Sequence, residues 1–416
     1  MQFHIFVMYS SVFTYVVLFI LHQFADGAIP CSPRDFGKGG TVCVCNATYC
    51  DTIEPPTRVP QGQFLLYSSS MDGLRMKKLI KTFSTTMTQT GGATYKVNVN
   101  QTYQTIFGFG TAFTDAAGIN FVNLQPGAQE NLLRSYFSPD GIELNFGRVP
   151  IGGTDFSTHP YTYDDHHEND NNLSHFNLTM EDFTYKIPIL KRAQAMSARP
   201  IQLLAAAWSP PVWMKTNKEI AGYGFLQEKY YQLWADYHTK FLDEYKKHGL
   251  KFWGMSTGNE PLNGIIPIKG INALGWTPFT QRTWIAKHMG PTLRASQHNK
   301  TNLLAMDDQR FFLPWWIQLD LNHWVTGWID WNYALNMKGG PVWIDNYVDA
   351  PVIVNEKEGE FYKQPMFYGL GHFSKFILDG SKRVQLLRQR NGETRRLEIV
   401  AFMQPDQAVV VVIFNG

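Results

Sequence analysis

From Thr105 to Trp331 the chain alternates short apolar segments with loops and amphipathic helices, and this alternation limits the folds that it can adopt. Strands that alternate with helices over roughly 225 residues predict a parallel sheet. Polar or aromatic residues follow the apolar segments directly, which favours a closed β/α barrel, because such barrels carry their chemistry at the carboxyl ends of the strands. The predicted strands are Ile106–Phe109, Leu144–Ile151, Ile201–Ala206, Phe252–Ser256, Leu303–Met306 and Val325–Trp331.

The clearest predicted helix runs from Glu228 to His248, between the third and the fourth of these strands. Two lysines occupy its last turn and Gly249 follows as a cap, which is typical of a helix C-terminus. We interpret the aromatic residues that recur at helical spacing as core residues: Trp234, Tyr237, Phe241 and Tyr245.

Both ends of the chain flank the predicted barrel with strand patterns of another kind. Thr57–Tyr103 alternates Ser and Thr with large apolar residues, as in a solvated antiparallel sheet. Val384–Asn415 returns to a strand pattern and contains the apolar segment Ala408–Phe414. We therefore expect a β side domain that is built from both chain ends.

The first residues predict entry into the secretory pathway. Met1–Leu21 contains no Lys, Arg, Asp or Glu, and its apolar segment Val12–Leu21 is followed by small residues. We expect a signal peptide that is cleaved near Gly27. Because the usual positive charge before the apolar segment is missing, a signal anchor is the alternative.

The cysteines and glycosylation sequons also predict an oxidising compartment outside the cytosol. All four cysteines lie between Cys31 and Cys50. Cys43 and Cys45 are too close in sequence to pair comfortably, so the simplest arrangement is two sequential loops, Cys31–Cys43 and Cys45–Cys50. No Cys-x-x-Cys spacing suggests a zinc site. The five sequons begin at Asn46, Asn100, Asn172, Asn177 and Asn299.

The charge of the chain favours an anionic membrane surface over nucleic acid as a partner. The net charge is +2 at pH 7, with 12 histidines counted as neutral. Below about pH 6 these histidines become protonated, and the resulting positive charge favours an anionic membrane surface in an acidic compartment. Lys and Arg do not cluster with aromatic residues, so nucleic acid is a poor candidate partner.

The most informative motif is Phe252-Trp-Gly-Met-Ser-Thr-Gly-Asn259-Glu260-Pro261. Pro261 has no backbone donor and biases Glu260 away from helical geometry, so we expect the strand to end there with the carboxylate pointing outward. A glycosidase uses a carboxyl in a partly desolvated pocket, beside an amide, as its proton donor. The alternative is a turn after a buried strand, with Glu260 merely solvated.

Other residues at the predicted strand ends fit a sugar site. Trp rings stack on the apolar faces of sugars, while carboxylates and amides bind the hydroxyls. Each residue alone is more typical of a structural role, but together, in register with the strand ends, they predict a carbohydrate site. The residues are Arg148, Asp155, Trp208, Asn259, Glu260, Asp330, Trp331 and Asn332.

The chain resembles the glucosylceramidases of glycoside hydrolase family 30, with matching motifs in order from Cys31 to Asn415. Among the most specific are Cys43-Val-Cys-Asn-Ala-Thr-Tyr-Cys50-Asp, Trp213-Met-Lys-Thr-Asn217, Asn259-Glu-Pro, Asp307-Asp-Gln-Arg310 and Gly327-Trp-Ile-Asp-Trp-Asn332. The resemblance implies an α/β fold, a (β/α)8 TIM barrel with an antiparallel β side domain. It implies a lysosomal retaining β-glucosidase that hydrolyses glucosylceramide to glucose and ceramide in sphingolipid catabolism, without metal or cofactor.

The resemblance also assigns roles and partners. Glu260 matches the acid/base of the family. The positions that contact glucose match Asp155, Trp208, Asn259, Trp331 and Asn346. The implied partners are a glucosyl lipid, an anionic membrane surface and a small saposin-type activator.

One departure from the family concerns the catalytic nucleophile. A retaining glycosidase needs a second carboxylate about 5 Å from the first. In the family it follows the seventh strand, but here Leu319 runs directly into Asp320, so the sequence predicts that about two βα units and the nucleophile are absent. Six predicted strands agree, since the barrel needs eight. Three candidate replacements lie in a polar loop that we interpret as solvated: Glu356, Glu358 and Glu360.

These patterns predict the following domains: 1–27 a signal peptide, 28–56 a disulfide-rich segment, 57–103 with 383–416 a C-terminally truncated β-sandwich side domain, and 104–382 a catalytic barrel with a deletion near 319–320. We interpret the deletion as a splicing or gene-model event within an enzyme gene. Two alternatives are a secreted, non-catalytic glycan or glycolipid binder derived from such an enzyme, and a relative that acts on polysaccharide.

Overall fold

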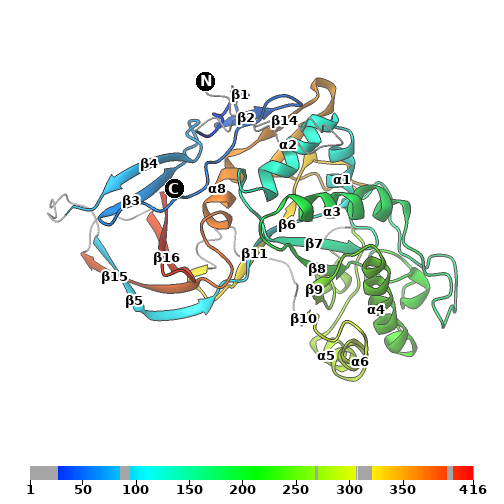
Figure 1. Cartoon of the computed structure of the whole chain (residues 1–416). Coiled ribbons are helices and arrows are strands. Elements are labelled where there is room, and N and C mark those ends of the chain that lie inside the picture. Colours follow the sequence, from blue (N-terminus) through cyan, green and yellow to red (C-terminus); the bar gives the residue numbers. More distant parts are fainter. Residues whose placement is uncertain are drawn as a thin grey trace, which may run out of the picture.

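A six-stranded parallel sheet forms the centre of the computed structural model, in the order β10-β9-β8-β7-β6-β11 (Figure 1). The structure describes residues 27–84, 94–267, 270–305, 307, 321–390 and 397–415. The predicted parallel sheet is confirmed, with small shifts at the strand ends. Its strands are β6 (Gly108–Ala112), β7 (Phe146–Ile151), β8 (Gln202–Ala207), β9 (Phe252–Ser256), β10 (Asn302–Leu304) and β11 (Gly327–Asn332).

The sheet does not close into a complete barrel within the described part of the chain. There, β10 pairs only with β9, and β11 pairs only with β6. Since a closed barrel of this class has eight strands, six of them form an incomplete one, as predicted. The predicted deletion point between residues 319 and 320 lies outside the described residues.

Helices connect the strands of the sheet and cover it (Figure 1). The predicted helix Glu228–His248 is confirmed: a 3-10 turn leads into α4, its four aromatic residues are buried, and Gly249 follows with a φ of 82° that favours glycine. None of the helices in the described ranges is long and apolar enough to cross a membrane. The α-helices are α1 (Asp115–Val122), α2 (Pro126–Phe137), α3 (Ile187–Met196), α4 (Tyr231–Lys247), α5 (Pro278–Trp284), α6 (Gly290–Ala295) and α8 (Pro365–Ser374).

Strands from both chain ends form the side domain, as predicted. The four-stranded antiparallel sheet has the order β17-β16-β15-β5. The pair β3 (Gln63–Ser68) and β4 (Lys77–Thr82) forms a separate two-stranded sheet, so the pattern of Thr57–Tyr103 gives strands in two sheets. The domain boundaries themselves stay predictions. The strands of the larger sheet are β5 (Thr94–Thr105), β15 (Lys382–Arg390), β16 (Leu397–Met403) and β17 (Val409–Asn415).

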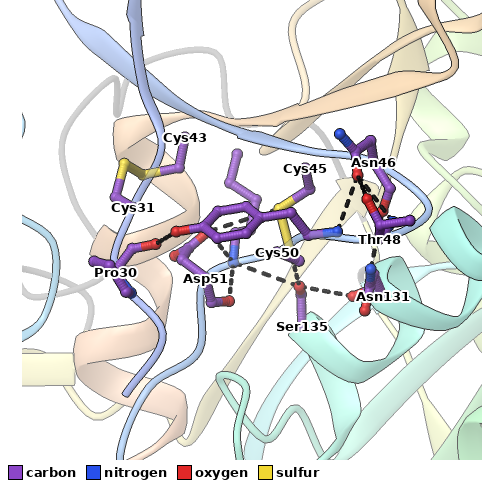
Figure 2. The surroundings of a disulfide bond; sticks show 12 residues. Pro30, Cys31, Cys43, Cys45, Asn46, Thr48, Cys50, Asp51, Asn131 and Ser135 are labelled. Carbon is purple, nitrogen blue, oxygen red and sulfur yellow. Dashed lines mark hydrogen bonds and ion pairs between the residues drawn. A yellow bond between two sulfur atoms is a disulfide. The ribbon is translucent and has the colours of Figure 1, made fainter. Parts of the chain in front are cut away.

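The cysteine-containing segment belongs to a fourth sheet, in the order β1-β2-β14-β13-β12. The structure joins Cys31 to Cys43 and Cys45 to Cys50, the pairing that was expected (Figure 2). The strands are β1 (Pro33–Asp35), β2 (Thr41–Cys45), β12 (Leu335–Asn336), β13 (Val352–Asn355) and β14 (Glu360–Lys363). This sheet therefore ties the N-terminal segment to the part of the chain that follows β11.

Side chains of α2 anchor the disulfide segment to the barrel (Figure 2). Asn131 donates a hydrogen bond to the carbonyl of Asn46 at 2.9 Å, and Ser135 lies 3.4 Å from the sulfur of Cys50. A buried ion pair between Lys363 and Asp51 at 2.7 Å lies beside them. The predicted signal peptide, residues 1–27, lies outside the described part of the chain except for its last residue, Gly27.

Candidate active site

Glu260 lies four residues beyond the end of β9, at the start of a short 3-10 helix. Its backbone is left-handed (φ 43°, ψ 60°), a conformation that costs a non-glycine residue about 1–3 kcal/mol and recurs at functional sites. The amide of Glu260 donates to the carbonyl of Asp307 at 2.6 Å, and Asn263 donates to its carboxylate oxygen Oε2 at 2.8 Å. The half-buried carboxylate is thus held by neighbouring groups instead of being merely solvated.

Arg148, on β7, organises the side chains around Glu260. Its Nη2 atom donates to Asn259 Oδ1 at 2.8 Å and to Asp307 Oδ2 at 2.7 Å. Its guanidinium carbon lies 4.7 Å from the ring centre of Trp208 and 5.5 Å from that of Trp331. One arginine therefore connects the amide beside Glu260 to two aromatic faces.

Trp208 and Trp331 form the aromatic face of the site. Their rings stack with centres 5.2 Å apart at 27°, although Trp208 follows β8 and Trp331 lies on β11. The pairing of β11 with β6 brings these distant parts of the sequence together. Trp208 is buried, whereas Trp331 is half-buried and leaves part of its ring accessible.

Asp155 and Asn346 form a second polar pair at the site. Asn346 donates to Asp155 Oδ2 at 2.6 Å, and the backbone amide of Trp343 donates to the carbonyl of Asp155 at 3.3 Å. Phe156, next to Asp155, meets the ring of Trp331 edge-on at 5.9 Å. The structure therefore brings together the residues that were predicted to contact sugar, while their roles stay predictions.

Two further residues of β11 have structural contacts instead. Asp330 accepts from the amide of Trp331 at 3.0 Å, and burial, followed by the charge of Asp330, raises the pKa of Tyr136 on α2. Asn332 is buried and accepts a hydrogen bond from Thr114, the N-cap of α1, at 2.6 Å. Consecutive side chains of a strand point to opposite faces, which explains why Trp331 reaches the aromatic face and Asp330 does not.

The polar loop that was interpreted as solvated requires one correction. Glu356 and Glu358 are exposed, as expected. Glu360 is not solvated: both of its carboxylate oxygens accept from Arg34, at 2.6 and 3.1 Å, and Tyr362 donates to it as well. The pairing of β14 with β2 positions Glu360 next to the N-terminal strands, which the local sequence did not reveal.

A buried cation lies behind the Asp155 loop. Lys186 is fully buried, with its ammonium 3.3 Å from Asp115 Oδ1 and 3.5 Å from Asp182 Oδ1. Burial opposes its charge, but the two carboxylates together hold the pKa of Lys186 above its ordinary value. Removing one partner from such a group leaves a buried charge uncompensated.

This charged cluster fixes the backbone on both sides of Asp155. Lys186 donates to the carbonyl of Gly152 at 3.2 Å, and Ser157 donates to Asp115 Oδ2 at 2.5 Å. Ser157 also accepts from the amide of Thr154 at 3.0 Å. The short loop that presents Asp155 is therefore held at both ends by buried hydrogen bonds.

The sequence held partial signals for these supporting residues. Arg148 and Asp307 were both noted in motifs, but their ion pair joins residues 159 positions apart, and no local pattern shows it. The spacing of Asp182 and Lys186, four residues apart on one helical face, was a usable signal that was overlooked.

Comparisons with known proteins agree with this geometry. A family model described as "Glycosyl hydrolase family 30 TIM-barrel domain" matches residues 106–322 and 317–377. The chain is 39% identical over 477 residues to "Lysosomal acid glucosylceramidase" of Mus musculus, covering 96% of this chain and 92% of the relative. It is 36% identical over 448 residues to "Putative glucosylceramidase 3" of Caenorhabditis elegans, covering 88% and 86%.

A solved structure supports the fold alone. SrfJ from Salmonella typhimurium aligns with a TM-score of 0.74 at 22% identity, over 85% of this chain and 92% of that chain. The sheets of the structure agree with the TIM-barrel fold of the matching family model, and the sequence relatives are glucosylceramidases. The chain belongs to glycosyl hydrolase family 30, among the glucosylceramidases.

Proposed function

We propose that this chain carries the sugar-binding half of a retaining β-glucosidase site for glucosylceramide, with Glu260 as acid/base and without the catalytic nucleophile. The observation that carries the proposal is the connection from Glu260 and Asn259 through Arg148 to the stacked Trp208 and Trp331. A glucose ring packed on the accessible part of Trp331 would present its glycosidic oxygen to Glu260, which would protonate the leaving group.

Three findings support the absence of the nucleophile. The family model matches in two segments that meet at residues 317–322. The similarity to the mouse relative extends over 477 residues, more than the 416 of this chain, so the relative has residues without a counterpart here. The described sheet ends at β10 and β11, where a complete barrel would have two more strands.

The carboxylates that are described near the site are already engaged. Asp307, whose carbonyl accepts from the Glu260 amide, gives its carboxylate to Arg148. Asp155 is bonded to Asn346. Neither is presented for attack on an anomeric carbon, and without that attack no glycosyl-enzyme intermediate forms.

The compartment and the partners follow from the same assignment. The two disulfides fit the secretory pathway, and the mouse relative is named as lysosomal. We propose a signal peptide that is cleaved near Gly27, glycosylation at the sequons, and a lysosomal location at the lumenal membrane. A glucosyl lipid, an anionic membrane surface and a saposin-type activator complete the proposal.

A second candidate function is non-catalytic binding of a glycan or glycolipid. Asp155, Trp208 and Trp331 serve binding and catalysis equally, since stacking and hydrogen bonds to hydroxyls need no nucleophile. A secreted chain that binds glucosyl lipid without hydrolysing it would favour this candidate.

The experiment compares the 416-residue chain with a restored chain, in which the corresponding segment of the mouse relative is inserted between Leu319 and Asp320. We expect no measurable β-glucosidase activity from the first and clear activity from the second. In the restored chain, Glu260→Gln should lower hydrolysis of an ordinary glucoside by about 10²–10⁴-fold, because the leaving group then receives no proton. A substrate with a very good leaving group should lose less.

Two results would contradict the proposal. Hydrolysis of a glucosyl lipid by the 416-residue chain would show that it has a nucleophile after all. Equal losses on both substrates in Glu260→Gln would assign a structural role to Glu260. Asn263→Ala is the matched control, since it removes a contact of Glu260 and leaves the carboxyl in place.

A further inference from the structure

A second cluster of polar side chains lies in the long loop between β7 and α3, outside the sugar site. Asp164, His167 and His175 each offer one ligand atom, and these atoms all lie within 4.8 Å of one another. The Nδ1 atom of His167 is 3.4 Å from Asp164 Oδ1. None of these residues has a role in the site described above.

Asp164 is the unusual member of the cluster. Its side chain is fully buried, yet neither carboxylate oxygen accepts a hydrogen bond within the described part of the chain. A buried carboxylate without such partners is costly, and proteins normally compensate it with an ion pair or a metal ion. The carboxylate is therefore available to a cation.

The backbone around Asp164 is fixed. The indole of Trp213 donates to the carbonyl of Asp164 at 2.9 Å, and the amide of the preceding Tyr163 donates to the hydroxyl of Tyr237 at 2.8 Å. Both anchors come from the β8–β9 segment of the barrel. The carboxylate thus keeps its position while the two histidine side chains, 42% and 57% exposed, can turn toward it.

Asp170 prepares His175 as a ligand. Its carboxylate oxygen Oδ2 lies 3.1 Å from His175 Nδ1, and because an ionised carboxylate only accepts, Nδ1 must carry the proton. The lone pair of His175 is then on Nε2. A carboxylate that accepts from the second nitrogen of a histidine is the usual support of a metal-binding imidazole.

We propose that Asp164, His167 and His175 form a zinc-binding site in the β7–α3 loop. Two imidazoles and one carboxylate form a ligand set that suits Zn²⁺, with water in the fourth position. Bonds of about 2.0–2.2 Å place tetrahedral ligand atoms roughly 3.4 Å apart, which is the separation of His167 from Asp164.

Binding requires one rearrangement. The rings of His167 and His175 are stacked face to face, with centres 4.1 Å apart at 5°. Since a metal ion is bound in the plane of an imidazole, at least one ring must turn edge-on toward the ion. The bound ion would join the two ends of the 164–175 segment and tie them to α4 and the β8 loop.

The experiment uses the full chain, purified from the secretory pathway, with Zn²⁺ alone as the probe. Competition with a chromophoric chelator should show one zinc per chain, and zinc should raise the thermal midpoint. We expect Asp164→Asn and His175→Gln to lower the affinity by about 100-fold or more, and Asp170→Asn by about 10–100-fold. Asp164→Asn replaces a buried carboxyl that accepts no hydrogen bond within the described part of the chain, so without zinc it should not lower the thermal midpoint.

His166→Asn is the matched control. It removes a neighbouring histidine outside the cluster, and asparagine tolerates the left-handed backbone of this position (φ 65°). Zinc binding should survive this change. The absence of saturable binding, equal binding in Asp164→Asn, or loss of binding in His166→Asn would each overturn the proposal.

Discussion

The residues of the middle strands of the parallel sheet are mostly buried, whereas most residues of its two end strands are half-buried or exposed. β7 and β8 each have a neighbour on both sides, and all but one residue of each strand is buried. In β10 no residue is buried, and in β11 only Asn332 is. All four belong to one parallel sheet, and the strands of such sheets are normally buried on both faces. The greater exposure of β10 and β11 goes with their position, since each has only one neighbour among the described strands.

The covered strands also hold most of the groups that support the site. Arg148 lies on β7, Trp208 follows β8 and Asn259 follows β9. The buried Lys186 cluster fixes the loop after β7. β11 adds Trp331, and Asp307 follows β10 in the sequence. Neither end strand has a described partner on its outer side. The side chains of the proposed sugar site therefore lie together in a sheet of six described strands.

The largest expected effect is on the free energy of unfolding, and it concerns the buried Lys186 cluster. Lys186→Met would leave Asp115 and Asp182 buried without their cation, and breaking a buried pair in this way costs about 3–5 kcal/mol. The free energy of unfolding from urea titration measures the effect. Lys191→Met, an exposed position on the same α3 helix, is the control and should change stability by less than about 0.5 kcal/mol. Equal stability of the two variants would show that the Lys186 cluster does not stabilise the chain.

A smaller effect concerns Lys215, a buried lysine that lacks the carboxylate partners of Lys186 among its described contacts. Comparing the two shows how carboxylates, rather than burial, keep the pKa of Lys186 high. Lys215 is also fully buried, but the described contacts of its ammonium are the carbonyls of Ile220 and Ala273, and burial lowers its pKa to about 7. Between pH 7 and the unfolded pKa of about 10.4, the unfolded chain holds this proton and the folded chain does not. Stability should therefore rise with pH across this window, by up to about 3 kcal/mol between pH 6 and 9.

Thermal midpoints measured from pH 6 to pH 9 check this dependence. Lys215→Met should flatten the rise, because the variant has no proton to lose. Lys191→Met again serves as the control and should keep the slope of the parent chain. A parent chain whose midpoint falls over this range would contradict the assignment.

The sequence predicted more of the sheet than of the site. Apolar segments located all six strands, and helical spacing located α4, because burial imposes a local pattern on the sequence. Strand-end chemistry also named Glu260, Asn259 and the two tryptophans. The ion pair of Arg148 with Asp307 and the left-handed backbone of Glu260 were not predicted, since both depend on how separate loops meet in space.

The smallest expected effect on stability concerns the end strands themselves. An uncovered strand presents unpaired backbone groups to other chains, so this chain should self-associate through β10 and β11. Val325 is 36% exposed just before β11, and a charge there should oppose such pairing. Val325→Lys should therefore reduce the large species in light scattering while changing the free energy of unfolding by less than about 0.5 kcal/mol.

Met180→Lys is the matched control for this test. It places the same charge on an apolar residue that is 57% exposed at the start of the helical segment leading into α3, away from the ends of the parallel sheet. If both variants reduce association equally, net charge is responsible and the end strands are not the contact. In the restored chain, where two added strands would pair with β10 and β11, Val325→Lys should have little effect on association, because the parallel sheet then has no exposed edge. Persistent association there would locate the contact in the side domain, where β17 exposes Val409, Val411 and Ile413 at the end of its own sheet.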